Sequence, residues 1–325
     1  MKTQRLHSRA RMSRRHFLAV ASGATLATMG GPAFGQAIAR KRFQILGFTK
    51  PFQQLTFEET ADIAAEVGWD GIECPVRAKG QILPERVEED LPQLVAALKK
   101  RNVEVSILAT DVQDATHPLT QKVLRTASRL GVKKYRLGFM RYREDQPVLE
   151  QLHNLRAALR DLVALNLELG LHAGFQNHSG EGRIGAPVWD IFEVIRELDP
   201  KYIGIFFDIG HATLEGGYSW PTQARLMQPF MSAVYVKDFV WQKTPKGWQA
   251  NWCPLGEGTV HREFFQRLRK STFAGPISQH YEYELGQRPQ MIRAMKKDLQ
   301  VLQEWLTGGG EARRESCISD FKSQI

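Results

Sequence analysis

Short apolar runs alternate with longer amphipathic stretches along most of the chain. The short runs are typical of strands that are buried on both faces, and the longer stretches place apolar residues three or four positions apart, which predicts helices. Strands are predicted at residues 42–49, 70–76, 103–111, 132–139, 171–178, 202–211, 232–239 and 275–283. Helices are predicted at residues 56–69, 91–102, 120–131, 147–170, 187–199, 221–231, 260–273 and 288–308. Thr56 and Glu59 have the spacing of a capping box at the start of the first helix.

This succession of strand-helix units predicts an α/β fold, a closed parallel (β/α)8 barrel of the TIM type that forms a single domain over residues 43–306. A length of 325 residues permits two domains, but α/β barrels of about 250 residues form one. The alternative is an open, doubly wound sheet. It is not favoured, because the residues after the first strand, 47–54, lack the G-x-G-x-x-G pattern.

The first 37 residues differ from the rest of the chain in charge. They contain six basic residues and no acidic one, so their removal lowers the formal net charge from +9 to +3. Arg14 and Arg15 precede an apolar run and then small residues around Ala33, an order that resembles twin-arginine export signals. We predict an export signal peptide at residues 1–37 and a periplasmic or otherwise exported mature protein. The alternative for this segment is a basic amphipathic tail.

Composition narrows the choice of partners. Outside the leader, no basic stripe argues for a nucleic-acid partner. The apolar run from Phe17 to Ala33 is interrupted by glycines and falls short of a span of about 20 apolar residues, so we expect no membrane insertion after signal removal. Residues 307–325 are polar and begin with glycines, which predicts a flexible tail.

Polar and ionisable residues gather where the predicted strands end. In a (β/α)8 barrel these ends form the active-site face, so the residues would form a polar ring above an apolar core. Strand alternation places Gln176 and His178 on one face and directs Asp238 away from Lys237, toward the helices. His172, deeper in its strand, is expected to be a barrel-interior histidine. The ring consists of Glu73, Arg77, Asp111, Arg136, Gln176, Asn177, His178, Asp208, His211, Lys237, His280 and Glu282.

Five segments in order, QNHSG (176–180), FDIGHATLEGG (207–217), VKDF (236–239), LGEGTVH (255–261) and GPISQHYEY (275–283), resemble the xylose-isomerase-like TIM-barrel superfamily. Within it the chain is similar to proteins of the sugar phosphate isomerase/epimerase type. The resemblance implies a divalent metal held at the ends of strands five to eight, which here carry Gln176, Asp208, Tyr235 and His280. Of these four positions, only Asp208 carries the residue type that the family's metal site uses.

Two alternatives follow for the cofactor. Gln176, Asp208 and His280 could hold Mn²⁺, Mg²⁺ or Zn²⁺ together with water. Otherwise the site is free of metal, and Lys237 or His280 supplies the positive charge that polarises a carbonyl.

The resemblance also implies a reaction, proton abstraction next to a sugar carbonyl through an enediolate, as in isomerases and epimerases. A small sugar or glycoside is the expected partner. The expected catalytic residues are Glu73, His178, Lys237 and Glu282, and the expected substrate-binding residues are His211, Asn177 and, for an anionic group, Arg77 and Arg136. One alternative is a lyase that acts on a 3-keto glycoside, where the same first step expels the glycosidic oxygen. The other is a barrel that binds a sugar without catalysis.

Overall fold

The computed structural model describes residues 42–308. The predicted export signal and nearly all of the predicted tail lie outside the described residues. Within the described range, none of the helices is long and apolar enough to cross a bilayer.

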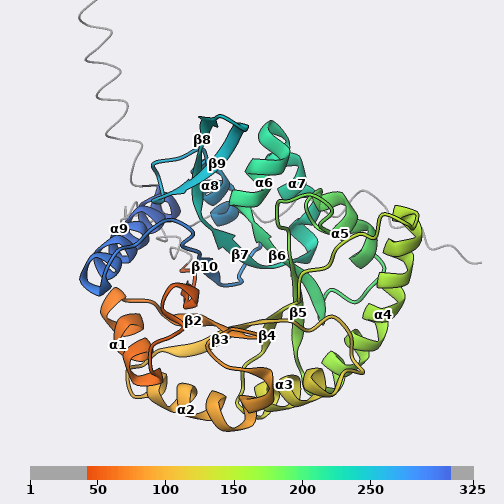
Figure 1. The fold of residues 1–325 in the computed structure, drawn as a ribbon, viewed down its shortest axis with the longest axis horizontal. Coiled ribbons are helices and arrows are strands. Elements are labelled where there is room, and N and C mark those ends of the chain that lie inside the picture. Colours follow the sequence, from red (N-terminus) through yellow and green to blue (C-terminus); the bar gives the residue numbers. More distant parts are fainter. Residues whose placement is uncertain (1–41, 309–325) are drawn as a thin grey trace, which may run out of the picture. The chain divides into compact units, whose positions relative to one another are not determined.

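Eight parallel strands close into a barrel in this range, with helices around it (Figure 1). Neighbours in the barrel follow the chain, and β1 closes the ring against β10. This arrangement confirms the predicted (β/α)8 fold. The barrel strands are β1 (Ile45–Phe48), β2 (Gly71–Val76), β3 (Glu104–Thr110), β4 (Lys134–Arg136), β5 (His172–Gln176), β6 (Ile203–Asp208), β7 (Met231–Val236) and β10 (Ile277–Gln279).

The helices cover the outside of the barrel, and most lie within a few residues of the predicted ranges, although the helix at Ile209–Gly216 was not predicted. At the first helix the capping box is present, because Thr56 Oγ1 accepts a hydrogen bond from Glu59 N and the Glu59 carboxylate accepts one from Thr56 N. The α-helices are α1 (Phe57–Val67), α2 (Val87–Lys99), α3 (Pro118–Arg129), α4 (Val148–Leu169), α5 (Val188–Ile195), α6 (Ile209–Gly216), α7 (Trp220–Met227), α8 (Glu263–Lys270) and α9 (Arg288–Thr307).

One predicted boundary differs at the site. The strand predicted to reach His211 ends at Asp208, because the Asp208 side chain caps α6 and its Oδ1 accepts a hydrogen bond from His211 N at 3.0 Å. His211 therefore lies in the first turn of a helix. The helix predicted at 221–231 is likewise shorter, since α7 ends at Met227 and a 3₁₀ turn follows.

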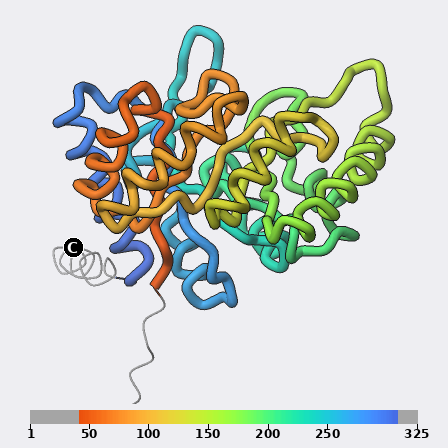
Figure 2. Tube along the Cα trace, turned by 90° about the horizontal axis from the view of Figure 1, so that it is seen from below, coloured from red at the N-terminus to blue at the C-terminus, as the bar shows by residue number. Residues whose placement is uncertain are grey.

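An antiparallel hairpin after β7 is absent from the sequence prediction. It consists of β8 (Asp238–Thr244) and β9 (Gly247–Cys253), joined by a two-residue loop. In Figure 2 the hairpin, drawn in cyan, projects from the body of the barrel. Register places Trp252 opposite Phe239, near the base of the hairpin.

Two apolar layers lie below the polar ring. The larger one fills the space between the strands and the helices. The smaller one lies inside the barrel and contains Phe206 and Tyr235. Gly174 on β5 makes room for it, because a Cβ there would lie 2.2 Å from the Phe206 ring. His172 also lies inside, as expected, with its two ring nitrogens against Lys201 O and Ser232 Oγ.

Candidate active site

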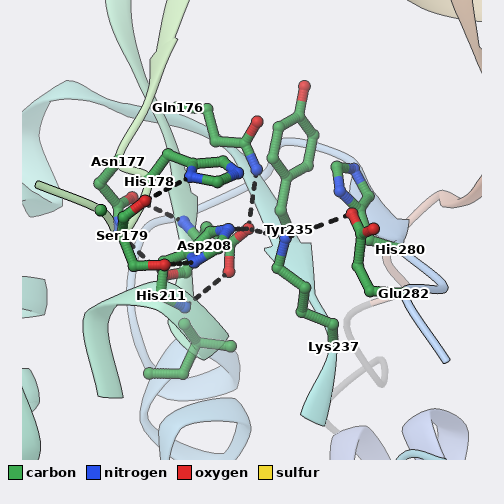
Figure 3. A network of polar contacts seen from close by, with 12 residues as sticks. Gln176, Asn177, His178, Ser179, Asp208, His211, Tyr235, Lys237, His280 and Glu282 are labelled. Atoms are coloured by element: carbon green, nitrogen blue, oxygen red, sulfur yellow. Dashed lines mark hydrogen bonds and ion pairs between the residues drawn. The ribbon is translucent and has the colours of Figure 1, made fainter. Parts of the chain in front are cut away.

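Asp208 is the centre of a buried polar cluster at the ends of β5, β6 and β7 (Figure 3). Its side chain is fully buried. Oδ1 accepts the backbone N–H of His211, and Oδ2 accepts a hydrogen bond from Gln176 Nε2 at 2.8 Å. Lys237 Nζ lies 3.1 Å from the same Oδ2. Both oxygens of this carboxylate are therefore engaged by nitrogen donors of the protein.

Lys237 joins Asp208 to Glu282. Its ammonium, on a residue that is 4% exposed, lies 3.9 Å from Glu282 Oε1 and 5.1 Å from the centre of the Trp252 ring. A buried ammonium is stable only where opposite charge compensates it, and these two carboxylates supply that charge. Burial acts to raise the pKa of Glu282, but Lys237 and Lys50, whose Nζ lies 2.8 Å away, hold it below its ordinary value. Glu282 is therefore ionised at neutral pH and able to accept a proton.

His178 and His211 lie against each other, with ring centres 3.8 Å apart. Burial and the charge of Lys237 lower the pKa of His178 to about 4 and that of His211 well below its ordinary value, so both are neutral at pH 7. Ser179 Oγ lies 2.8 Å from His211 Nδ1. His211 Nε2 is buried and has no hydrogen-bond partner among the described residues. Such a nitrogen suits a substrate hydroxyl.

Asn177 was expected to contact the substrate, and the structure places it against the backbone instead. Its Nδ2 donates to Asp208 O and its Oδ1 accepts from Asp208 N, at 2.9 and 2.8 Å. These two bonds tie the ends of β5 and β6 together and orient Asp208.

Glu73 is the centre of a second network inside the barrel. Its carboxylate accepts hydrogen bonds from Tyr235 Oη and Ser278 Oγ and lies 2.9 Å from His280 Nε2. Burial acts to raise the pKa of Glu73, but His280 and then Arg136 hold it below its ordinary value. Glu73 is fully buried, so it orients His280 and Tyr235 rather than facing the barrel mouth.

The other expected residues have separate positions. The Asp111 carboxylate accepts a hydrogen bond from Ala78 N at 3.0 Å and so holds the loop after β2. Arg77 is half-buried, 5.9 Å from the Phe48 ring centre. Arg136 is buried at the end of β4. Asp238, as expected, points away from Lys237, and its carboxylate accepts backbone N–H groups of residues 239, 256, 258 and 260.

The residues expected to bind metal do not fit a divalent cation as they are arranged. Gln176 presents its amide nitrogen, not its oxygen, to Asp208, and the Lys237 ammonium already lies at Oδ2. His280 is directed to Glu73. Within residues 42–308, no group of three or more His, Cys, Asp or Glu side chains could hold a metal ion.

Three contributors were missed by the sequence analysis: Trp252, Lys50 and Ser278. Trp252 contacts both Lys237 and His211, with ring centres of Trp252 and His211 5.4 Å apart. No strand-end signal marks it, because it comes from the unpredicted hairpin. Lys50 and Ser278 could have been found from their places next to the end of β1 and within β10.

Fold and cluster together define a parallel (β/α)8 barrel with a polar site at the strand ends. A model of the xylose isomerase-like TIM barrel family matches residues 61–305, and the chain belongs to this family. An uncharacterised protein of Methanocaldococcus jannaschii is 25% identical over 161 residues, 49% of this chain and 50% of that protein. The chain thus spans about half the length of this curated relative.

Solved structures share the fold. A 3-keto-D-glucoside 4-epimerase from E. coli aligns with a TM-score of 0.63 and 15% identity, covering 81% of this chain and 99% of that one. A D-tagatose 3-epimerase-like protein aligns with a TM-score of 0.63 and 19% identity, covering 81% and 97%. A xylose isomerase-like TIM barrel protein from Mycobacterium smegmatis, in complex with magnesium, aligns with a TM-score of 0.61 and 15% identity, covering 81% and 98%.

Proposed function

We propose that this barrel is a sugar isomerase or epimerase that removes a proton next to a carbonyl and uses Lys237 where relatives use a divalent metal. One observation carries the proposal. The buried Lys237 ammonium lies between the carboxylates of Asp208 and Glu282, 3.1 and 3.9 Å away, at the end of the barrel where the expected metal ligands gather.

Glu282 is the proposed base. It takes the proton from the carbon beside the carbonyl, and the C–H electrons form the double bond of an enediolate whose oxygen carries the negative charge. Lys237 stabilises that oxygen, an effect worth about 2.7–4 kcal/mol for one well-placed donor. Return of a proton to the opposite face of the same carbon produces an epimer, and return to the neighbouring carbon produces an isomer.

The remaining residues hold these groups in place. Asp208, fixed by Gln176 and Asn177, orients the Lys237 ammonium. His211 Nε2, which has no hydrogen-bond partner within residues 42–308, is suited to a substrate hydroxyl. The Trp252 ring lies 5.1 Å from the Lys237 ammonium, and its apolar surface limits water near the developing charge.

A second candidate is a lyase that acts on keto glycosides. The E. coli structural neighbour is named for a 3-keto glucoside, and a proton removed beside such a ketone can be followed by loss of the glycosidic oxygen. The first step is identical, so the product separates the two reactions. For the leader we propose export by the twin-arginine route, which cell fractionation with an Arg14→Lys/Arg15→Lys variant would test.

The decisive experiment measures solvent deuterium incorporation into a panel of ketoses, aldoses and 3-keto glycosides by NMR, with enzyme treated with EDTA. We expect incorporation by the treated enzyme and its loss in Glu282→Gln. Glu284→Gln is the matched control, because Glu284 is exposed two residues away. Activity that EDTA abolishes and Mn²⁺ restores would contradict the role of Lys237. No incorporation into any sugar would favour a binding protein.

A further inference from the structure

Four arginines near the barrel mouth have no ion-pair partner among residues 42–308. They are Arg77, Arg136, Arg141 and Arg183, and none has a carboxylate oxygen within 4.0 Å in the described part of the chain. Most other arginines of the described chain belong to surface ion pairs. A group of unpaired guanidinium ions beside a polar site requires an explanation, because like charges repel and burial penalises them.

Arg136 is the most unusual of the four. It is 2% exposed, and its one hydrogen bond within the described residues runs from Nη1 to Leu137 O at 2.9 Å. The nearest acids interact with it only at longer range and form no hydrogen bond with it: the Glu73 oxygens accept from other side chains, and Asp111 accepts from a backbone N–H. Burial lowers the pKa of Arg136 below its ordinary value. The guanidinium nevertheless stays charged, because arginine is not deprotonated in proteins.

Phe139 lies against both Arg136 and Arg183. The guanidinium carbons of Arg136 and Arg183 lie 4.3 and 4.7 Å from the centre of the Phe139 ring. The edge of that ring contacts His178, with centres 4.7 Å apart, and His178 lies against His211. The two guanidinium groups are therefore next to the polar cluster of the site, on the side of β4 and β5.

We propose that Arg136 and Arg183, held by Phe139, bind an anionic group of the sugar substrate. This inference rests on the proposed function for the identity of the ligand as a sugar. Guanidinium groups recognise carboxylate and phosphate oxygens by paired N–H donors, and Arg136 has such donors without a partner in the described part of the chain. The substrate class is an acidic sugar, in which a carboxylate or a phosphate occupies this position while the carbonyl carbon lies near Glu282.

The test measures binding without turnover, by isothermal titration calorimetry on the full chain. The probes are glucuronate, galacturonate and glucose 6-phosphate, with glucose, galactose and inorganic phosphate for comparison. We expect at least one acidic sugar to bind about tenfold or more tightly than its neutral counterpart, because hydrogen bonds to charged groups are strong. Added salt should narrow that difference. The uronate and phosphate arms identify which anion the site takes.

Two variants and a control complete the design. Arg183→Ala should remove most of the preference for the acidic sugar, and Arg136→Lys should weaken it, because lysine keeps the charge but loses the planar pair of donors. Arg160→Ala, on the exposed face of α4, should keep the preference. Arg183 is only partly buried, so its variant tests the proposal even if Arg136 variants fail to fold.

Several outcomes would overturn the inference. Equal affinity for acidic and neutral sugars would do so, as would a preference that survives Arg183→Ala and Arg136→Lys. Inorganic phosphate that binds as tightly as every acidic sugar would indicate adventitious anion binding. If the preference is found but no sugar exchanges deuterium, the anion site stands and the proposed reaction fails. If neutral sugars alone exchange, the reaction stands and the anion site fails.

Discussion

Replacing Lys237 by methionine should show how much the buried ion pair between Lys237 and Asp208 contributes to the free energy of unfolding. Methionine fills a similar volume but carries no charge, so Asp208 would keep its donors from Gln176 and His211 and lose its cation. At 3.1 Å and an effective dielectric constant of about 20, the Coulomb attraction is roughly 5 kcal/mol. Part of this is offset, because the variant no longer buries an ammonium. Breaking one partner of a buried pair costs about 3–5 kcal/mol.

The assay is equilibrium urea unfolding at neutral pH, followed by tryptophan fluorescence. We expect Lys237→Met to lower the unfolding free energy by about 3 kcal/mol or more. Lys243→Met, at an exposed position of the hairpin, is the control and should change it by less than about 0.5 kcal/mol. Deuterium exchange should fall by about 10²–10³.

A double-mutant cycle with Asp208→Asn separates the interaction energy of Lys237 and Asp208 from the contribution that each side chain makes through packing. Asp208→Asn/Lys237→Met should be more stable than the sum of the two single effects implies, by about 1–3 kcal/mol. A coupling free energy near zero, or a Lys237→Met protein as stable as the control, would refute the claim that the two charges hold this site together.

Three further changes test other parts of the structure. Gln176→Glu should lower the unfolding free energy, because a second carboxylate would face Asp208. Millimolar Mn²⁺ should not restore the unfolding free energy while Lys237 lies at Asp208 Oδ2. Recovery with Mn²⁺ would show that the site can bind a metal. Burial raises the pKa of Asp298 to about 7, above the unfolded value of about 3.9, so its contribution to stability is complete in acid and is lost as the pH rises toward 7. Asp298→Asn should remove that decline, and identical urea midpoints for both proteins from acid to neutral pH would contradict it. Trp252→Ala should slow deuterium exchange about tenfold by uncovering Lys237, whereas Trp248→Ala at the exposed tip of the hairpin should not, and equal rates would rule out a covering role.

The barrel could be predicted because each signal acts locally. Apolar runs that end in polar residues mark strands buried on both faces, and the capping box at Thr56 and Glu59 marks a helix start without reference to the rest of the chain. Where a boundary was wrong, a side chain decided it: Asp208 caps α6, so the strand stops three residues before His211. The hairpin was missed because β8 and β9 stabilise each other by pairing, and few of their side chains are fully buried.

The sequence predicts which residues lie at the site, but not which of their side chains contact one another. Strand parity correctly separates Asp238 from Lys237, since it depends only on alternation. It does not say which side chains will meet across the barrel. Glu73 and His280 lie 207 residues apart in the chain, and their contact depends on the register between β1, β2 and β10. The roles of Glu73 and Asn177 as positioning residues follow from such contacts.

The departures from the family's ligand pattern depend on one another. Tyr235 stands at the position of the family's strand-seven histidine. Its hydroxyl donates a hydrogen bond to Glu73 and is not directed to Asp208. His280 is held by the same glutamate. With two ligand positions turned away, a glutamate at 176 would repel Asp208, whereas Gln176 donates a hydrogen bond to it and Lys237 supplies the charge. A glutamate restored alone at 176 or 280 would therefore add a carboxylate beside Asp208 or Glu73 before it builds a metal site.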